Sequence, residues 1–123
     1  MDNLAKLQES GEMYLETILL LKKKKANVRA TDIVAELGYS KSSVSRAVNL
    51  LKDKGLITIG EDTVLEFTEA GNKIAKETYD RHIILADFLM GLGVERSIAE
   101  EDACRIEHVI SKESFEALKK IIK

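Results

Sequence analysis

A cysteine, a glutamate and a histidine stand close together within residues 104–108. Cys104 is the only cysteine of the chain, and His108 is one of its two histidines. On a helix, residues at i, i+3 and i+4 project from one face. The thiolate of Cys104, the carboxylate of Glu107 and the imidazole of His108 would then converge as ligands of a soft-to-borderline divalent cation. The spacing also fits a small buried cysteine beside a solvated Glu107–His108 pair, so it leaves both interpretations open.

Two long helices frame the elements that must position this motif. Tyr14, Ile18 and Leu21 recur at helical spacing and predict a first helix over about residues 3–25. A helix over about residues 95–110 carries the motif itself. The remaining elements lie between these two.

A helix-turn-helix is predicted directly after the first helix. Residues 31–38 read as a short helix with Thr31 as its N-cap and Gly38 as its stop. Ser40 then caps a second helix that runs to about Asp53. Two helices joined by a few residues around a glycine are typical of this motif.

A β-hairpin follows, because residues 56–59 and 64–67 have strand composition and flank a short turn that begins with Gly60. Helix, turn, helix and hairpin in this order form a winged helix, which serves DNA-binding proteins and protein-interaction modules alike. DNA binding is favoured because the N-terminal end of the second helix carries small hydroxyl and basic side chains, which suit the major groove. The candidate DNA contacts are Arg29, Ser40, Lys41, Ser42, Ser43 and Arg46.

The second half of the chain predicts a helical dimerisation lobe. Thr68 caps a long helix over about residues 69–91, and Ser111 caps a last one. The long helix is apolar over more than one face, so a two-fold partner is expected to cover it. We divide the chain into residues 1–72 and 73–123. The expected dimer contacts are Ile84, Leu85, Phe88, Leu89 and Leu92.

Composition limits the possible functions. The chain has 123 residues, of which 45% are hydrophobic and 33% charged, with a net charge of −2. No apolar run is long enough to cross a membrane, and a lone cysteine is typical of a reducing compartment, so a cytoplasmic protein is expected. The acidic balance requires a local basic patch for any DNA contact. We find no nucleophile–base pair and no phosphate-binding glycine loop, so no enzyme activity and no small-molecule substrate are expected.

The sequence resembles the diphtheria toxin repressor and manganese transport regulator family of metal-activated repressors. The resemblance covers nearly the whole chain and is sharpest at residues 12–15, 40–48, 81–82 and 102–109. It implies a mainly α fold with a winged helix-turn-helix followed by a helical metal-binding and dimerisation domain. It also implies that a methionine of the first helix joins the later motif in the activating metal site, as in the iron-dependent branch. The positions that match this site are Met13, Cys104, Glu107 and His108.

A second metal site is suggested by the same resemblance. His82 matches a histidine that binds metal in both branches, and Glu16 matches a ligand of the manganese branch. Ala86 and Glu100 depart from the iron branch, which has a carboxylate and a histidine there. A satisfied histidine is the alternative role for His82. The SH3-like third domain of many iron-branch members is not expected within these residues.

The resemblance implies a homodimer that binds palindromic operator DNA when loaded with metal and represses metal-uptake genes. Two sulfur ligands favour Fe(II) over Mn(II), while Zn(II), Co(II) or Ni(II) could substitute in vitro. Two other functions remain open: a redox sensor built on Cys104, and a metal-independent winged helix that binds only proteins.

Overall fold

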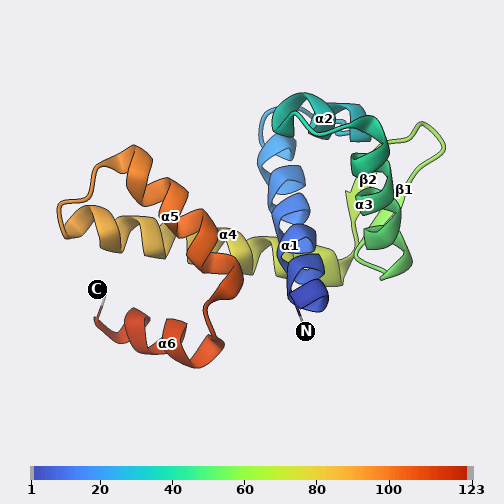
Figure 1. The fold of residues 1–123 in the computed structure, drawn as a ribbon. Coiled ribbons are helices and arrows are strands. Elements are labelled where there is room, and N and C mark those ends of the chain that lie inside the picture. Colours follow the sequence, from blue (N-terminus) through green and yellow to red (C-terminus); the bar gives the residue numbers. More distant parts are fainter. Residues whose placement is uncertain (1, 122–123) are drawn as a thin grey trace. The chain divides into compact units, whose positions relative to one another are not determined.

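The computed structural model describes the backbone of residues 2–121 and the side chains of residues 11–121. This part of the chain forms two compact units, Met1–Lys76 and Glu77–Lys123, whose boundary falls within a single long helix (Figure 1). The mainly helical architecture with one small hairpin confirms the predicted fold class. The elements in chain order are α1 (Asp2–Lys22), α2 (Ala30–Leu37), α3 (Lys41–Asp53), β1 (Ile57–Ile59), β2 (Leu65–Phe67), α4 (Glu69–Gly91), α5 (Arg96–Val109) and α6 (Lys112–Ile121).

The N-terminal unit is built around one hydrophobic cluster to which α1, α2, α3, both strands and the start of α4 contribute. Each fully buried aliphatic side chain stabilises the folded state by about 1.5–3 kcal/mol relative to its exposed form. The predicted apolar stripe of α1 faces this cluster. Its largest buried members include Leu15, Ile18, Ile33, Val44, Ile57 and Leu65.

The start of α2 differs from the prediction. Thr31 lies inside the helix and Arg29 is the N-cap. The backbone N–H of Arg29 donates to Asp32 Oδ2 at 2.8 Å, and Lys25 Nζ donates to Asp32 Oδ1 at 2.7 Å. An ionised carboxylate accepts more strongly than a threonine hydroxyl, so the helix starts earlier than the hydroxyl pattern predicts. The hydrogen bond from Lys25, followed by that from Arg29, lowers the pKa of Asp32.

The boundaries of α3 agree with the prediction. Gly38 ends α2 in the left-handed conformation, with φ at 72°, which glycine adopts without a Cβ penalty. Ser40 caps α3 by accepting a hydrogen bond on Oγ from the backbone N–H of Ser43 at 3.2 Å.

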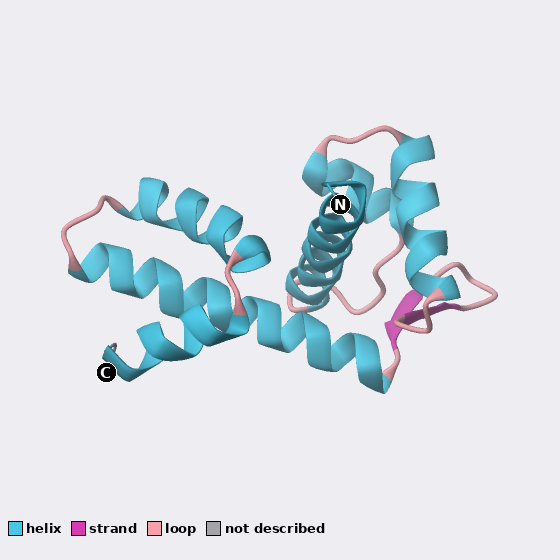
Figure 2. Cartoon of the chain, turned by 60° about the horizontal axis from the view of Figure 1, so that its bottom comes forward, coloured by secondary structure: helices cyan, strands magenta, loops and turns pink. Residues whose placement is uncertain are grey.

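The two strands form the predicted hairpin, which is antiparallel and pairs Ile57 with Phe67 and Ile59 with Leu65. Figure 2 shows these strands in magenta between α3 and α4. The chain then returns so closely that a Cβ on Gly71 would lie 1.8 Å from the carbonyl oxygen of Leu56. Only glycine fits this position of α4.

The C-terminal unit packs the second half of α4 against α5 and α6. Leu85 and Ala86 of α4, Ala103 of α5 and Phe115 of α6 form its core. Ser111 caps α6 as predicted, since its Oγ accepts from the backbone N–H of Ser114 at 3.0 Å. None of the helices in the described part of the chain is long and apolar enough to cross a membrane.

Candidate metal centre and nucleic-acid interface

The buried face of α5 presents a carboxylate where its other turns present alanine. Ala99, Ala103 and Glu107 follow one another at intervals of four residues and are all buried. Glu107 is only 1% exposed. Cys104 and His108 each follow this stripe by one residue, so they project beside Glu107. The local spacing of the sequence therefore places three different donor groups on one side of one helix.

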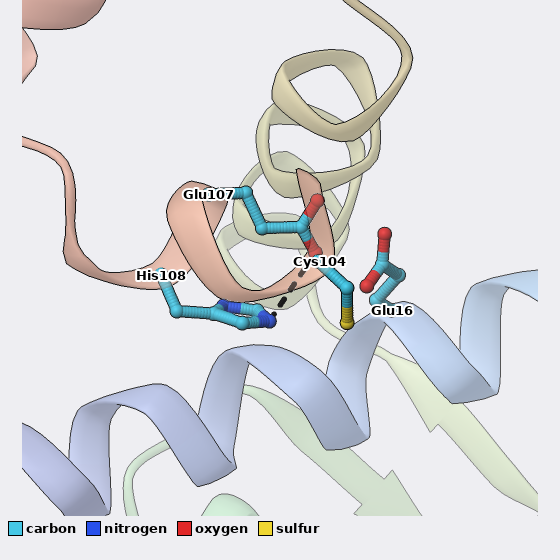
Figure 3. Close-up of side chains that lie close together, drawn as sticks. All are labelled: Glu16, Cys104, Glu107 and His108. Atoms are coloured by element: carbon cyan, nitrogen blue, oxygen red, sulfur yellow. Dashed lines mark ion pairs between the residues drawn. The ribbon is translucent and has the colours of Figure 1, made fainter. Parts of the chain in front are cut away.

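The three side chains converge as the spacing predicts. One ligand atom each from Cys104, Glu107 and His108 lies within 4.8 Å of the others. Figure 3 shows the sulfur, the carboxylate and the imidazole of α5 pointing to a common region, and it also draws Glu16 of α1. Ligand atoms that share one ion at about 2.0–2.3 Å lie within about 4.6 Å of each other, so the trio is close to coordination spacing.

Both oxygens of the buried carboxylate face an imidazole. His82 Nδ1 lies 2.9 Å from Glu107 Oε2, and His108 Nε2 lies 3.2 Å from Glu107 Oε1. With Glu107 ionised, the carboxylate can only accept, so His82 Nδ1 would be the donor of this hydrogen bond. Hydrogen bonds of this kind orient metal-binding carboxylates in proteins. The structure therefore brings His82 of α4 to the predicted motif.

The donor set fits a divalent transition metal. Moving a carboxylate out of water costs several kcal/mol unless opposite charge compensates it. Among the described residues, Glu16 and Glu107 are the only acidic side chains that are buried. Both belong to the set of metal ligands predicted from sequence. A thiol, an imidazole and a buried carboxylate together suit a borderline cation.

The predicted ligands of α1 belong to the N-terminal unit. Met13 is half-buried and packs against the hydrophobic cluster of that unit. Met13 and Glu16 are three residues apart on α1, so they share one side of the helix.

The exposed side of α3 carries most of the predicted DNA contacts. Lys41, Ser42 and Arg46 are exposed. Ser40 and Ser43 instead bond to one another, since Ser40 Oγ donates to Ser43 Oγ at 2.9 Å in addition to its capping role. These two hydroxyls hold the first turn of α3.

Arg29 contacts the wing. Its Nε donates to the backbone oxygen of Asp62, in the turn between β1 and β2, at 3.0 Å. The Nη groups of this guanidinium remain as further donors. Arg29 therefore ties the start of α2 to the tip of the hairpin.

Two domains of one known protein family match the chain, each over its own range of residues. Residues 6–63 match the N-terminal DNA-binding domain of the iron-dependent repressors. Residues 68–123 match the metal-binding and dimerisation domain of the same proteins. Together these ranges span nearly the whole chain.

The chain belongs to the iron-dependent repressor family, which includes the diphtheria toxin repressor and MntR.

Individual relatives come from both branches of the iron-dependent repressor family. The transcriptional regulator MntR of Escherichia coli O157:H7 is 35% identical over 106 residues, which are 86% of this chain and 68% of MntR. The diphtheria toxin repressor of Corynebacterium diphtheriae is 30% identical over 118 residues, or 95% of this chain and 52% of the repressor. The structure of the manganese regulator SloR superposes with a TM-score of 0.80 at 26% identity, covering 90% of this chain and 52% of SloR. The chain thus spans about half the length of the latter two proteins.

Two positions depart from the iron branch of the family, and the structure gives each a local role. Ala86 is part of the core of the C-terminal unit. Glu100 accepts from Arg96 Nε on the same helix at 3.2 Å. His82, by contrast, contacts Glu107.

Sequence reasoning missed two exposed residues of α3, Ser45 and Asn49. Together with Ser42 they recur at i, i+3 and i+7, so they extend the exposed side that a family DNA-binding domain presents. Asn49 Nδ2 donates to the backbone oxygen of Ser45 at 2.8 Å, which orients its amide. Continuing the helical spacing from Ser42 would have found both.

The predicted dimer contacts of the family's dimerisation domain fall into two groups. Leu85 is 2% exposed and packs in the core of its own unit, so it has little surface for a partner. Ile84, Phe88 and Leu89 are half-buried, and Leu92 is 68% exposed. Leu92 thus has the most surface to offer.

Proposed function

We propose that this protein is a metal-activated transcriptional repressor that reads duplex DNA with α3 and the hairpin. The observation that carries the proposal is the buried carboxylate of Glu107, which has an imidazole at each oxygen and the thiol of Cys104 beside it. No packing role requires a carboxylate in a stripe otherwise made of alanine. Family membership supports both the metal and the DNA.

The ligands proposed for the cation come from two helices. Cys104, Glu107 and His108 of α5 offer sulfur, oxygen and nitrogen donors. We add Met13 and Glu16 of α1, because they match ligands in the two branches of the family and because Glu16 is a buried acid. His82 holds Glu107 in place in this arrangement, and a second-site role for His82 would use its other nitrogen.

Fe(II) is the cation we favour, with Mn(II) second. A thiolate, and a thioether if Met13 takes part, favour a softer ion than Mn(II), which prefers oxygen. Zn(II), Co(II) and Ni(II) suit the same donors and would serve in vitro. The relatives named for manganese lend weight to Mn(II), so a comparison of the two ions is part of the test.

In this proposal, residues of α5 and residues of α1 would bind the same cation. The cation supplies positive charge that offsets buried carboxylate. Residues from α5 and α1 that share it would restrict the freedom of α1, which packs against α3 in the N-terminal unit. Ligand binding of this kind shifts the population toward the DNA-binding arrangement.

The chain would bind DNA as a dimer with a second copy of itself. A two-fold dimer places two α3 helices on two half-sites, so the operator would be a palindrome. Leu92, Leu89 and Phe88 are the residues we assign to the dimer contact. The regulated genes would be those of metal uptake, as in other metal-activated repressors of the family.

The proposal is tested by DNA selection followed by affinity measurement. Duplexes that bind are selected from a random-sequence library under anaerobic conditions with Fe(II), and in parallel with Mn(II). The affinity of the protein for the selected duplex is then measured with and without each ion. We expect metal to tighten binding by about 5–150-fold, the usual range of coupling between two sites.

Cys104→Ala supplies the decisive variant and Arg105→Ala its control, because Arg105 is exposed on the same helix. The first is expected to lose the metal response while the second keeps it. Equal metal-stimulated binding by Cys104→Ala and the unmodified protein would refute the assigned centre. Failure to select any duplex with either ion would refute the proposed function.

A further inference from the structure

Two tyrosines meet at the junction between α1 and the start of α3. The rings of Tyr14 and Tyr39 lie edge to face, with centroids 6.4 Å apart and planes inclined by 63°. Tyr14 belongs to α1 and is 5% exposed, whereas Tyr39 lies in the connection between α2 and α3 and is 44% exposed. Burial raises the pKa of Tyr14. The half-exposed ring of Tyr39 therefore packs edge to face on the buried ring of Tyr14.

Tyr14 shares its turn of α1 with Met13 and Glu16. Successive residues of a helix are turned by roughly 100°, so Tyr14 and Glu16 lie about 200° apart around the axis. One side of this turn therefore packs Tyr14 into the hydrophobic cluster of the N-terminal unit. The other side carries Glu16. Whatever fixes or shifts this turn acts on both sides at once.

Tyr39 lies next to the N-cap residue of α3. It directly precedes Ser40, whose hydroxyl caps α3 and bonds to Ser43. Tyr14 also lines a shallow hollow together with Ser43 and Arg46 of α3. The ring contact thus joins α1 to the end of α3 that carries the candidate DNA contacts.

We infer that Tyr39, seated against Tyr14, is a positioning residue that transmits the state of α1 to the first turn of α3. This inference rests on the proposed function, because the state of α1 matters only if metal controls it. The ring, not the hydroxyl, makes the contact. Removing the ring should uncouple DNA affinity from metal without changing the affinity for metal.

The experiment compares the unmodified protein with Tyr39→Ala, Tyr39→Phe and Leu20→Ala. Leu20 is a matched control, because it is exposed to a similar degree and lines a hollow formed by residues of α1, α2 and the connection between them, and none of α3. For each protein we measure the affinity for Co(II), the melting temperature, and the affinity for the selected duplex with and without metal. The affinity for the duplex with metal, divided by the affinity without metal, is the metal-stimulated increment.

Tyr39→Ala is expected to reduce this increment about 2- to 10-fold, the range set by the strength of an aromatic pair. Its metal affinity and its metal-free DNA affinity should stay unchanged, and Tyr39→Phe and Leu20→Ala should keep the full increment. NMR of the ring protons of Tyr14 gives an independent signature: metal should shift them in the unmodified protein and in Tyr39→Phe.

Three results would overturn the inference. A full increment in Tyr39→Ala would show that the ring transmits nothing. An equal loss with and without metal would indicate a direct DNA contact or a general structural role. A loss in Tyr39→Phe as large as in Tyr39→Ala would assign the effect to the hydroxyl. If the unmodified protein shows no increment, the proposed function fails instead, so the two failures are distinguishable.

Discussion

Glu107 is the central side chain of the proposed metal site. It occupies a helix position that packing would fill with a small apolar residue, and it is surrounded by nitrogen and sulfur donors. A buried carboxylate destabilises the fold unless its neighbours compensate the charge. The hydrogen bond with His82 provides part of that compensation, and a bound cation would provide more.

Glu107→Gln should separate metal binding from folding. Glutamine keeps the shape but removes the charge, so we expect metal affinity to fall at least about 10-fold. The metal-free protein should melt at an unchanged or higher temperature, because the buried charge is gone. With the unmodified protein, a metal concentration of 100 times Kd should stabilise the fold by about 2.7 kcal/mol.

Thermal melting with and without Co(II) makes the comparison. Glu101→Gln is the control, since Glu101 is an exposed acid on the same helix. Metal stabilisation that survives in Glu107→Gln would contradict the role assigned to this carboxylate.

The metal motif could be predicted from sequence because its residues lie within two turns of one helix. The i, i+3 and i+4 spacing fixes their common face wherever the helix packs. The contact of His82 with Glu107 joins residues 25 positions apart, and only tertiary packing creates it. Its relevance could be anticipated from the family resemblance, whereas its geometry could not. The predicted DNA contacts did not include Ser45 and Asn49, because only side chains near the N-terminal end of α3 were expected to reach DNA.

At the scale of elements, the start of α2 shows how local rules compete. Thr31 has the side chain of an N-cap, but the carboxylate of Asp32 accepts from the backbone N–H of Arg29, and the helix is capped at Arg29, two residues earlier. Lys25 and Arg29 then tie the end of α1 and the hairpin turn to the same point. The periodicity of the sequence predicts that the helix exists. Its first residue depends on whether the Thr31 hydroxyl or the Asp32 carboxylate accepts the capping hydrogen bond.

This link predicts a pH-dependent contribution to stability. The folded-state pKa of Asp32 is lowered, so its stabilisation is complete above the unfolded pKa of about 3.9 and is lost as pH falls through the lower folded value. Asp32→Ala should therefore cost about 0.5–2 kcal/mol at pH 7, the range for losing a helix-capping side chain. The cost should shrink as the pH falls below about 4.

Urea unfolding at a series of pH values measures this difference, with Glu61→Ala in the exposed turn of the hairpin as control. A cost for Asp32→Ala that stays constant down to the lowest pH would show that the charge of Asp32 contributes nothing.

The junction between the hairpin and α4 leads to a second prediction at this scale. Gly71→Ala would drive a Cβ into the carbonyl oxygen of Leu56, which accepts a hydrogen bond from the backbone N–H of Thr68, so the backbone would have to shift and disturb that bond. We expect a loss of about 3 kcal/mol or more in the free energy of unfolding. Gly91→Ala should be neutral or stabilising, because no atom lies within 4 Å of its added Cβ. Circular dichroism during urea unfolding would show both, and equal stability of the two variants would contradict the close packing.

At the scale of the whole molecule, the chain has two compact units joined through the continuous helix α4. The N-terminal unit carries the proposed DNA face and two proposed ligands, and the C-terminal unit carries the other three proposed ligands and the proposed dimer surface. Periodicity and turn chemistry predicted every element, since each depends on local sequence. The sequence did not show that Leu85 would be buried in the core of the C-terminal unit and so have little surface for a dimer partner. This burial depends on how α4, α5 and α6 pack together.

Anaerobic titration with Co(II), followed by absorption spectroscopy, tests the central claim most directly. The account predicts an intense near-ultraviolet band from thiolate-to-cobalt charge transfer that saturates as the site fills and is absent in Cys104→Ala. A spectrum with no such band, or one that Cys104→Ala leaves unchanged, would contradict a metal centre built on Cys104, Glu107 and His108.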